Sequence, residues 1–444
     1  MSGAAPRPTG LFRVYRGATR LLLPLAARSV AKKLRAHDVP EARIAERQGH
    51  ASLPRPDAPL IWVHAASVGE SLAVLTLMTR LGERLPGHEF LITSGTATSA
   101  ELIEKRMPPR CRHQFGPLDA PGPVDRFLAH WRPDAAIFVE SEIWPLMLVR
   151  TRASGARLAL VNARLSAGSV RGWSKWPKTA AYVLDQFALF LTQNRASTDN
   201  LLAMGANPAR VVTGINLKST SAPLPVDQST LAALGTALGN RPVWVASSTH
   251  AGEEETVLAA HKALLAQHPD LCLLLVPRHP DRRDEIAGLI AQAGLTHCTR
   301  STGALPGPQD QVYLADTLGE LGTWYAAAPI VFMGGSLLPI GGHNPFEPAD
   351  AGAALLTGPH VTNFAESYAP LFSLGAAREV KDARELTGAV GALLGHPDTL
   401  ERMRAAVRDF AARRQSSLDE MVETLCTALA LDTAEASLPR RDGT

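Results

Sequence analysis

From residue 60 onward, short apolar runs rich in Val, Ile, Leu and Phe alternate with longer stretches that can form crossover helices. Each run is too short for a helix and ends in a polar or glycine-rich turn, which is typical of a strand buried on both faces of a sheet. The first half predicts strands at 60–63, 89–93, 135–139, 157–161, 189–192 and 210–214, and the second half at 243–246, 271–276, 311–314, 330–333 and 354–357. This alternation predicts an α/β protein with two parallel sheets.

The segment 219–227 is rich in Ser and Pro and lacks this periodicity, so we expect a linker over 219–240. The linker separates an N-terminal domain at 51–218 from a C-terminal domain at 241–432, which a tail at 433–444 follows. A chain of 444 residues supports two domains, because one hydrophobic core seldom serves so long a chain.

The first fifty residues differ from the rest of the chain in charge. They carry ten Lys and Arg residues against three acidic residues, whereas the whole chain has a formal net charge of +3. A helix through this segment carries apolar residues on one stripe and cations on another, namely Leu11, Val14, Tyr15, Ala18, Leu22 and Leu25 against Arg13, Arg16 and Arg20. We therefore expect 1–50 to be an amphipathic segment that lies on an anionic membrane surface.

Segment 1–50 has four alternative interpretations besides a helix on the membrane surface. A spanning helix needs about 20 mostly apolar residues, and the longest uninterrupted apolar stretch, 21–27, is shorter and contains Pro24. A secretory signal would need a longer apolar core and a clear cleavage site. A mitochondrial-type presequence and an ordinary packing helix remain alternatives to membrane contact.

Composition excludes several chemistries. The cysteines, Cys111, Cys272, Cys298 and Cys426, show no metal-ligand spacing, and we interpret them as reduced residues of a cytosolic protein. His343 also lacks a partner at metal-ligand spacing, so the sequence predicts no metal. Because the basic surplus is confined to the first fifty residues, we expect no nucleic-acid partner.

Two turns that follow predicted strands and open helices are the main chemical signal. They lie at 65–70 (AASVGE) and 341–347 (GGHNPFE). Free backbone N–H groups at such turns hold phosphates and developing negative charge. Polar residues also follow other predicted strands, at 140–142, 216–218 and 277–280. Two such turns in two separate halves predict a ligand cleft between two domains.

The motifs at these strand ends resemble those of a known family. The runs WVHAASVGE, VESEIWP, VNARLS, LVPRHP, DTLGEL and GGSLLPIGGHNPFEPA are similar to those of the 3-deoxy-D-manno-octulosonic acid (Kdo) transferases, in order from about residue 46 to about residue 363. The resemblance implies the GT-B architecture, with two Rossmann-like domains. It also implies transfer of Kdo from CMP-Kdo to a lipid A precursor, with inversion at the anomeric centre, at the cytoplasmic face of the bacterial inner membrane. CMP-Kdo is then the donor substrate, and no cofactor is expected.

An inverting displacement needs a base that takes the proton of the acceptor hydroxyl. The resemblance implies that Glu70 is this base and that Glu140 and Lys218 support the transition state. The structural alternative for Glu70 is complementation of the helix dipole. After Lys218 this sequence departs from the family pattern, since Ser219 and Thr220 stand where many relatives have Phe-Asp.

Glu140 also has a structural alternative. Ser141 could cap a helix that begins near Ile143, which would make Glu140 and Glu142 first-turn acids. We favour Glu140 over Glu142 as the functional acid because of its position in the family motif.

The second domain is expected to bind the donor. The resemblance implies CMP contacts from three strand-end segments, which comprise Pro277 and Arg278, then Leu318, Gly319 and Glu320, and then Asn344, Pro345, Phe346 and Glu347. Arg278 would offer a planar cation to the phosphate, unless it pairs with Asp281. Asn344 is expected to cap a helix with Pro345 at its first position.

Tryptophans and cations mark a candidate acceptor surface. Trp144, Trp173 and Trp176 either pack against the acceptor's acyl chains or sugars or fill local core. We expect the basic stretch 164–178 to guide a bisphosphorylated acceptor.

Two other functions fit a two-domain α/β chain. One is a different GT-B enzyme, either a nucleotide-sugar glycosyltransferase or an epimerase, and the runs HAASVGE and PRHP argue against it. The other is a non-catalytic, two-lobed solute-binding protein, which would call for an export signal and would leave Glu70 without a role.

Overall fold

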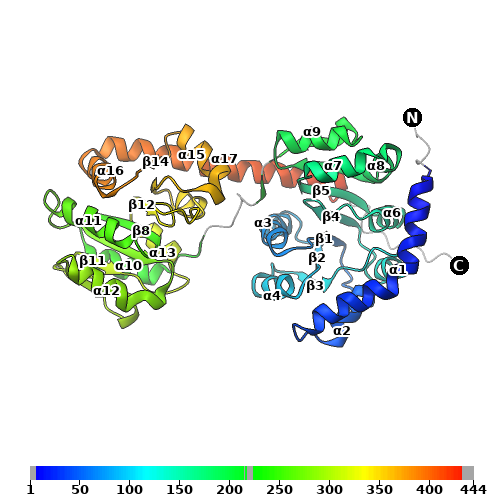
Figure 1. The fold of residues 1–444 in the computed structure, drawn as a ribbon, viewed down its shortest axis with the longest axis horizontal. Coiled ribbons are helices and arrows are strands. Elements are labelled where there is room, and N and C mark those ends of the chain that lie inside the picture. The colour runs from blue at the N-terminus through cyan, green and yellow to red at the C-terminus, as the bar shows by residue number, and fades with distance from the viewer. Residues whose placement is uncertain (1–6, 215, 218–223, 433–444) are drawn as a thin grey trace. The chain divides into compact units, whose positions relative to one another are not determined.

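The computed structural model describes residues 7–214, 216–217 and 224–432, which fall into two compact units. The first unit takes the chain up to residue 220 and again from residue 416, and the second takes 221–415. Each unit is built on one seven-stranded parallel sheet (Figure 1). The predicted α/β class with two parallel sheets is therefore confirmed.

The sheet of the first unit has the strand order β3-β2-β1-β4-β5-β6-β7. Its strands are β1 (Leu60–His64), β2 (Glu89–Ser94), β3 (Cys111–Phe115), β4 (Ala135–Val139), β5 (Arg157–Ala163), β6 (Phe187–Thr192) and β7 (Val211–Thr213). The order changes direction between β1 and β4, which are parallel neighbours. Doubly wound sheets bind ligands at such a switch point, beyond the carboxyl ends of the strands.

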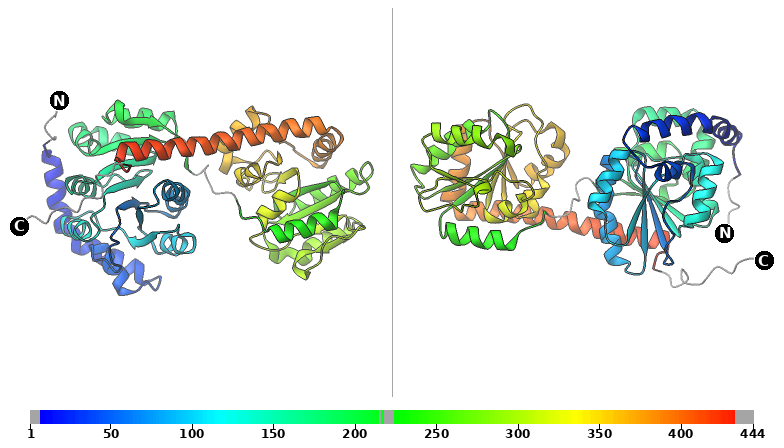
Figure 2. Two further views of the ribbon diagram at one scale, coloured as in Figure 1. Left: turned by 180° about the vertical axis from the view of Figure 1, so that it is seen from behind. Right: turned by 90° about the horizontal axis from the view of Figure 1, so that it is seen from below.

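Helices cover both faces of this sheet (Figure 2). Because side chains alternate along a strand, Ile61 and Val63 of β1 belong to one apolar cluster, and Leu60 and Trp62 belong to the other. The helices are α3 (Val68–Arg84), α4 (Ala97–Arg106), α5 (Pro121–Trp131), α6 (Pro145–Ala153), α7 (Ala167–Ser174), α8 (Pro177–Leu184) and α9 (Arg195–Ala203), with the 3₁₀ turn η2 (Pro208–Arg210) before β7.

The predicted N-terminal helix is present as α1 (Gly10–Arg35), and α2 (Glu41–Ile44) and η1 (Ala45–Gln48) follow it. Its two ends are packed, since Phe12 and Leu34 are buried. The middle is exposed, with Leu21 at 80%, Leu22 at 57% and Leu25 at 64% of their maximal accessibility. Within the described part of the chain, no helix has the length and apolar character needed to span a bilayer.

The sheet of the second unit has the order β10-β11-β9-β8-β12-β13-β14, so its direction changes between β8 and β12. Its strands are β8 (Val243–Thr249), β9 (Cys272–Pro277), β10 (His297–Thr299), β11 (Val312–Leu314), β12 (Ile330–Met333), β13 (Ala354–Thr357) and β14 (Ala377–Glu379). The helical elements are α10 (Gln228–Leu238), α11 (Glu254–Leu265), η4 (Pro280–Arg282), α12 (Arg283–Gln292), η5 (Arg300–Thr302), α13 (Leu321–Ala327), α14 (Phe346–Asp350), η6 (Thr362–Phe364), α15 (Ala365–Ser373) and α16 (Ala383–Gly395).

The last helix, α17 (Pro397–Leu429), contributes to both units. Val407 and Phe410, near its start, belong to a core cluster of the second unit. Leu425 and Cys426, near its end, are fully buried in a core cluster of the first unit. Figure 2 shows the helix as one continuous orange-to-red ribbon.

The two units therefore differ from the expected domain boundaries at two places. The expected linker 219–240 contains α10, whose Leu234 and Leu238 are buried in the second unit. The expected domain 241–432 loses its last residues to the first unit, because the apolar face of α17 packs on the first sheet from Leu418 onward. The tail 433–444 lies outside the described residues.

We expect Leu425→Ala to lower the free energy of unfolding by about 2–5 kcal/mol, because it opens a cavity in a fully buried cluster. Urea denaturation followed by circular dichroism measures this change. Thr427→Ala, at an exposed position of the same turn, is the control and should change stability by less than about 0.5 kcal/mol. Equal effects of the two substitutions would refute the packing of α17 in the first unit.

Candidate active site

Glu70 lies beyond the carboxyl end of β1, at the third position of α3. Its Oε2 atom accepts hydrogen bonds from the backbone N–H groups of Ala66 at 2.8 Å and Ser67 at 3.4 Å. The Ser67 Oγ atom in turn accepts one from the N–H of Glu70 at 3.4 Å. This is a capping box, in which Ser67 and Glu70 satisfy each other's free amides. Glu70 thus has a structural role at the start of the helix, whatever its chemical role.

The surroundings of Glu70 favour proton uptake. Burial raises the pKa of the Glu70 carboxyl above its ordinary value, and the negative charges of Glu142 and Glu140 raise it further. The hydrogen bonds from Ser67 and Ala66 offset part of this rise. A carboxylate with a raised pKa is a stronger proton acceptor, which suits a general base.

Glu142 is the buried acid of this site. Its Oε2 atom lies 3.2 Å from Nε2 of His64, and the indole N–H of Trp144 donates to the same oxygen. Burial alone would raise the pKa of Glu142, but the hydrogen bonds and charges of His64, Trp144 and Arg47 bring it below the ordinary value. Glu142 therefore carries a negative charge near Glu70 at neutral pH. The sequence motif favoured Glu140 and did not identify this role.

His64 and Arg47 complete the surroundings of Glu142. Nδ1 of His64 lies 2.8 Å from Oγ1 of Thr93, so both ring nitrogens of this buried residue have partners. Arg47 comes from η1 and donates to the carbonyl of Gly116. The sequence did not predict this cluster, because Arg47 lies seventeen residues before His64 and neither residue belongs to a motif with Glu142.

Glu140 is held at the end of β4 in an unusual backbone conformation. Its φ angle is 54°, and that of Asn162 on the neighbouring strand β5 is 53°. Asparagine adopts this left-handed region readily, whereas glutamate does so rarely, so surrounding contacts must hold Glu140 in this conformation. Nδ2 of Asn162 donates to Oε1 of Glu140 at 3.4 Å, and Oδ1 of Asn162 accepts the N–H of Leu217 at 3.0 Å. Asn162 therefore links Glu140 to the residue that precedes position 218.

Lys218 itself lies outside the described residues, so its predicted role stays a prediction. Asn162, by contrast, was part of the VNARLS run but was not singled out. Its function as a link depends on a bond to Leu217, which lies 55 positions away in the chain.

The helix after Glu142 does not begin as the structural alternative supposed. α6 starts at Pro145, and Trp144 rather than Ser141 occupies the position before it. Its first amides are bound by Asp119, whose carboxylate accepts the N–H groups of Met147 at 2.6 Å and Leu146 at 3.3 Å. The interpretation of Ser141 as a cap is therefore wrong, because a distant acid already serves this helix.

In the second unit, Pro277 ends β9 and Arg278 follows it with an exposed side chain. The Arg278 N–H donates to the carbonyl of Thr249 at 3.0 Å, which ties the turn to the end of β8. Among the described residues, no ion pair joins Arg278 to Asp281; the neighbouring Arg282 instead pairs with Glu254 and Glu285.

The segment 318–320 offers mainly backbone. Gly319 has a φ of 86°, and the Leu318 side chain is 78% exposed. The Glu320 carboxylate is engaged by Arg300, with contacts of 2.7 and 3.1 Å, and this pairing lowers its pKa. A ligand would therefore meet the chain here through main-chain groups and the Leu318 side chain.

The turn 344–347 is closed by its own side chains. Oδ1 of Asn344 accepts the N–H of Phe346 at 3.1 Å, and Nδ2 donates to Oε1 of Glu347 at 3.4 Å. α14 begins at Phe346, so Pro345 precedes the helix and the predicted register is one residue off. The Phe346 ring is buried, with the guanidinium of Arg414 4.2 Å from its centroid. Phe346 therefore faces the core, and its contact with a ligand would use the backbone.

Glu253 organises this region, and the sequence analysis missed it. The side chain is fully buried. Its carboxylate accepts the N–H groups of His250 at 3.0 Å, Gly335 at 2.6 Å, Ser336 at 2.9 Å and Leu337 at 2.9 Å. One carboxylate thus joins the ends of β8 and β12, at the switch point of the second sheet.

The loop after β12 is tight around this carboxylate. Gly335 has a φ of 65°, and a Cβ atom there would lie 2.8 Å from Nε2 of His343. The Nε2 atoms of His343 and His250 are 2.9 Å apart, so one of them donates to the other. Within the described ranges, no group of three or more His, Cys, Asp or Glu side chains is arranged to hold a metal ion.

Each unit carries one seven-stranded parallel sheet with polar side chains at its switch point, and two such domains make up the GT-B architecture. A structure of a glycosyltransferase from Rickettsia africae shares this fold, with a TM-score of 0.51 and 12% identity over 84% of this chain and 99% of that one.

Sequence comparisons then identify the family. Residues 42–221 match the model of the 3-deoxy-D-manno-octulosonic-acid transferase (kdotransferase) family. The 3-deoxy-D-manno-octulosonic acid transferase of Haemophilus influenzae is 34% identical over 86% of this chain and 90% of its own length. That of Bordetella pertussis is 36% identical over 84% of this chain and 89% of its own length. The chain belongs to the Kdo transferase family and is a glycosyltransferase, which excludes the epimerase and the solute-binding protein.

We expect Glu253→Ala to lower the free energy of unfolding by about 3 kcal/mol or more, because it removes the acceptor of four backbone N–H groups. Urea denaturation measures the loss. Glu255→Ala, at an exposed site on the same helix, is the matched control and should have little effect. A Glu253→Ala protein as stable as this control would show that the carboxylate does not hold the loop.

Proposed function

We propose that this protein transfers Kdo from CMP-Kdo to a lipid A precursor, with inversion at the anomeric carbon, in the synthesis of the lipopolysaccharide inner core. The observation that carries the proposal is the position of Glu70. In a chain of the Kdo transferase family, it is a carboxylate at the switch point of the first sheet, with a pKa raised by burial and by the charge of Glu142.

In the proposed reaction, Glu70 takes the proton of an acceptor sugar hydroxyl. The hydroxyl oxygen forms a bond to the anomeric carbon of Kdo on the face opposite the phosphate. The bond from that carbon to the phosphate oxygen breaks, and CMP leaves with the electron pair. A single displacement of this kind inverts the anomeric configuration.

Glu140 and Lys218 are proposed to support the transition state. A cation at Lys218 would hold the Kdo carboxylate or the departing phosphate, on which charge develops as the bond breaks. Glu140 would steady the positive character of the sugar or orient a neighbouring cation. The bonds of Asn162 to Glu140 and to the Leu217 amide support a shared location for positions 140 and 217.

The second unit is proposed to bind CMP-Kdo. Arg278 would meet the phosphate and Glu347 the ribose hydroxyls. The remaining contacts would come chiefly from the backbone and complete the proposed set of Pro277, Arg278, Leu318, Gly319, Glu320, Asn344, Pro345, Phe346 and Glu347. The exposed side chain of Arg278 and the engaged carboxylate of Glu320 are consistent with this division of roles. The reaction is proposed to need no metal.

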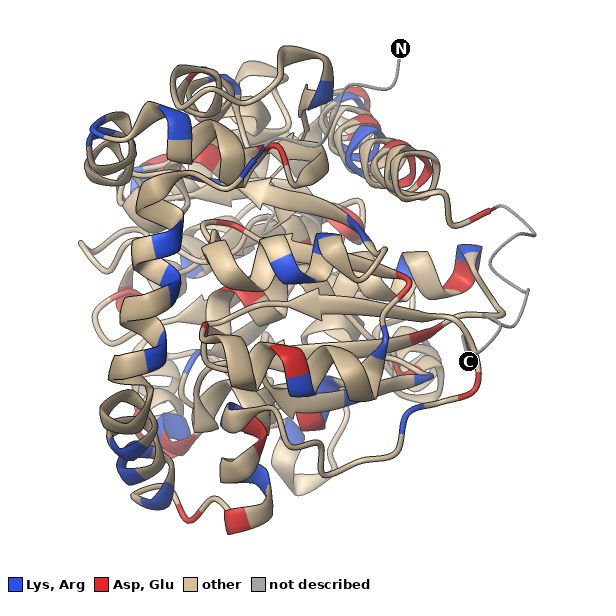
Figure 3. Cartoon of the chain, turned by 90° about the vertical axis from the view of Figure 1, so that its right-hand side faces the viewer, with Lys and Arg blue, Asp and Glu red and all other residues tan. Residues whose placement is uncertain are grey.

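The helix α1 is proposed to lie on the cytoplasmic face of the bacterial inner membrane. It contains seven Lys and Arg residues and no acid. Figure 3 shows these cations along the helix on the left of the view. The exposed Leu21, Leu22 and Leu25 would enter the interface, while the cations meet anionic headgroups.

The proposed function is tested by incubating the purified protein with fresh CMP-Kdo and a tetraacylated lipid A precursor without divalent metal. Mass spectrometry of the lipid should show a gain of one or more Kdo units, and the number of units gives the valency. An unchanged lipid mass, with CMP binding still detectable by calorimetry, would refute this choice of acceptor or donor sugar.

We expect Glu70→Gln to reduce kcat at least about a hundredfold, because the amide cannot take a proton. Its oxygen can still accept the Ala66 and Ser67 amides, so thermal stability should change little. The initial rate of Kdo transfer and the unfolding midpoint are the two measurements.

Ser67→Ala is the matched control for this substitution, since it removes the other half of the capping box. It should lower stability by about 1 kcal/mol and leave kcat nearly unchanged. If Glu70→Gln were active, or if both variants lost activity in proportion to stability, Glu70 would be a cap and not a base.

The proposal also gives a pH dependence. On the acid side, kcat/KM should fall as Glu70 takes up a proton, at a pH above that of an ordinary glutamate because its pKa is raised. Removing the negative charge in Glu142→Gln should lower the pKa of Glu70 and move this limb to lower pH. A pH profile of kcat/KM between about pH 4 and pH 8 measures the shift.

Glu101 is an exposed acid on α4, and Glu101→Gln is the control for charge removal. It should not change the pH at which kcat/KM falls on the acid side. A limb in Glu142→Gln that stays fixed or moves to higher pH would contradict the coupling of Glu142 to Glu70.

A further inference from the structure

The first unit contains an apolar cavity that the proposed chemistry does not use. It has a volume of about 500 Å³ and is lined by side chains of α1, of the loop before α6 and of α7, among them Leu11, Val14, Tyr15, Ile143, Trp144 and Trp173. Val14 is 67% exposed and Trp144 is 43% exposed. The cavity is therefore open to an apolar occupant from solvent or from a lipid phase.

The walls of the cavity are fixed by hydrogen bonds and packing. The Tyr15 hydroxyl donates to Oδ2 of Asp119 at 2.7 Å, and Asp119 also binds the first amides of α6. The Phe12 ring packs edge-on against Tyr182, with 5.2 Å between the ring centroids. A hydrogen bond of 2.8 Å joins the Thr9 and Thr179 hydroxyls. The start of α1 is thus anchored on the sheet domain, and the cavity is preformed.

One wall of the cavity leads directly to the candidate active site. The indole N–H of Trp144 donates to Glu142, which is paired with His64 and whose charge raises the pKa of Glu70. A molecule seated against Trp144 therefore lies two residues from the acid that influences the proposed base. This continuity distinguishes the cavity from the exposed leucines in the middle of α1.

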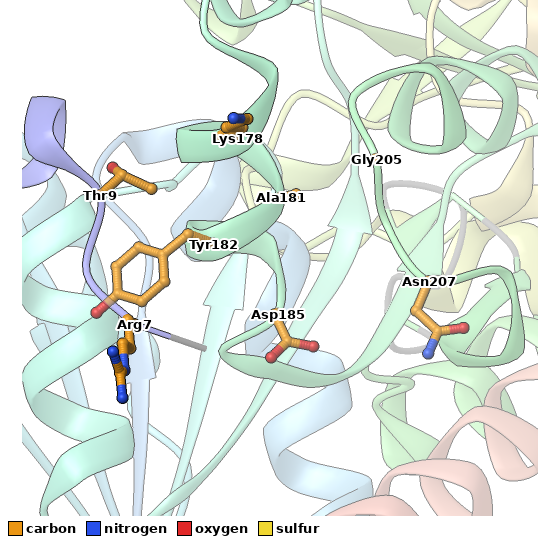
Figure 4. Close-up of a pocket in the computed structure, with 8 residues that line it drawn as sticks. All are labelled: Arg7, Thr9, Lys178, Ala181, Tyr182, Asp185, Gly205 and Asn207. Carbon is orange, nitrogen blue, oxygen red and sulfur yellow. The ribbon is translucent and has the colours of Figure 1, made fainter. Parts of the chain in front are cut away.

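Several basic residues lie in the segments that line the cavity. The stretch 164–184 carries Arg164, Arg171, Lys175 and Lys178 and no acid, and α1 is equally free of acids. Next to the apolar cavity lies a second cavity, whose lining includes the cations Arg7 and Lys178 and one acid, Asp185 (Figure 4). The Asp185 carboxylate is paired with Arg210 at 3.1 Å. Thr9 of the second cavity is bonded to Thr179 of the first, so the two adjoin.

An apolar cavity beside cations matches a molecule that carries both an acyl chain and a phosphate. We propose that the apolar cavity takes an acyl chain of the phosphorylated lipid acceptor, and that Arg7 and Lys178 face its phosphate. This inference rests on the proposed function, because it assigns part of the acceptor's binding site. The cavity then positions the acceptor sugar relative to the catalytic carboxylates.

The binding test uses a tetraacylated, phosphorylated acceptor with a photoreactive group at the end of one acyl chain. After irradiation, mass spectrometry should find the label on Leu11 to Tyr15, on 143–145 or on Trp173. Excess unlabelled acceptor should prevent labelling, whereas phosphatidylglycerol vesicles should not. Label on Leu21 to Leu25 instead, or equal competition by the vesicles, would overturn the inference and indicate general membrane anchoring. This test needs no turnover, so it can succeed or fail independently of the proposed function.

The kinetic test compares Trp173→Ala with Trp173→Phe. The alanine variant should raise KM for the acylated acceptor about tenfold while kcat stays nearly constant, and phenylalanine should restore most of the affinity. The KM for CMP-Kdo should not change. Trp176→Ala is the matched control, because Trp176 is exposed and lies outside the cavity lining. Equal KM values for Trp173→Ala and the wild type, or a loss confined to kcat, would overturn the inference.

Discussion

Carboxylates that accept backbone N–H groups hold the loops at both switch points in place. A parallel strand that ends before a helix leaves amides without partners, and each must find an acceptor. In the first unit, Glu70 binds the amides after β1, and Asp119 binds those that open α6. In the second, Glu253 binds four amides from the ends of β8 and β12. The amides at these strand ends therefore already have acceptors within the protein.

This arrangement also sets the acidity of the first site. Burying several acids close together favours protonation of the one with the weakest support. Burial raises the pKa of Glu70 most. Glu142 is supported by His64, Trp144 and Arg47 and stays ionised, and its charge raises the pKa of Glu70 further. At the ends of the neighbouring strands, a bond from Asn162 to Glu140 joins two residues that both have positive φ angles. The capping and the proton affinity of Glu70 thus both depend on its buried surroundings.

The sequence predicted the buried strands well, because each is a continuous apolar run between turns. It missed β3, whose residues Cys111–Phe115 read CRHQF and include a buried His113 that contacts Ser94 at 2.9 Å. It also missed the three-residue edge strands β10 and β14. At the site, motif positions located Glu70 and Glu140, but Glu142, Asn162 and Glu253 owe their roles to bonds across long stretches of chain. Bonds of this kind do not show in the hydrophobic pattern of the sequence. The packing of the end of α17 in the first unit does not show there either.

The central claim is that the surroundings of Glu70 make it a base and not only a helix cap. Its own ionisation tests this most directly, through ¹³C NMR of carboxyl-labelled glutamate, with the Glu70 signal assigned by its loss in Glu70→Gln. We predict a midpoint above the ordinary glutamate value of about 4.3, and a lower midpoint in the Glu142→Gln protein. A midpoint at or below the ordinary value would contradict the account, since the amides of the capping box would then outweigh burial and the charge of Glu142.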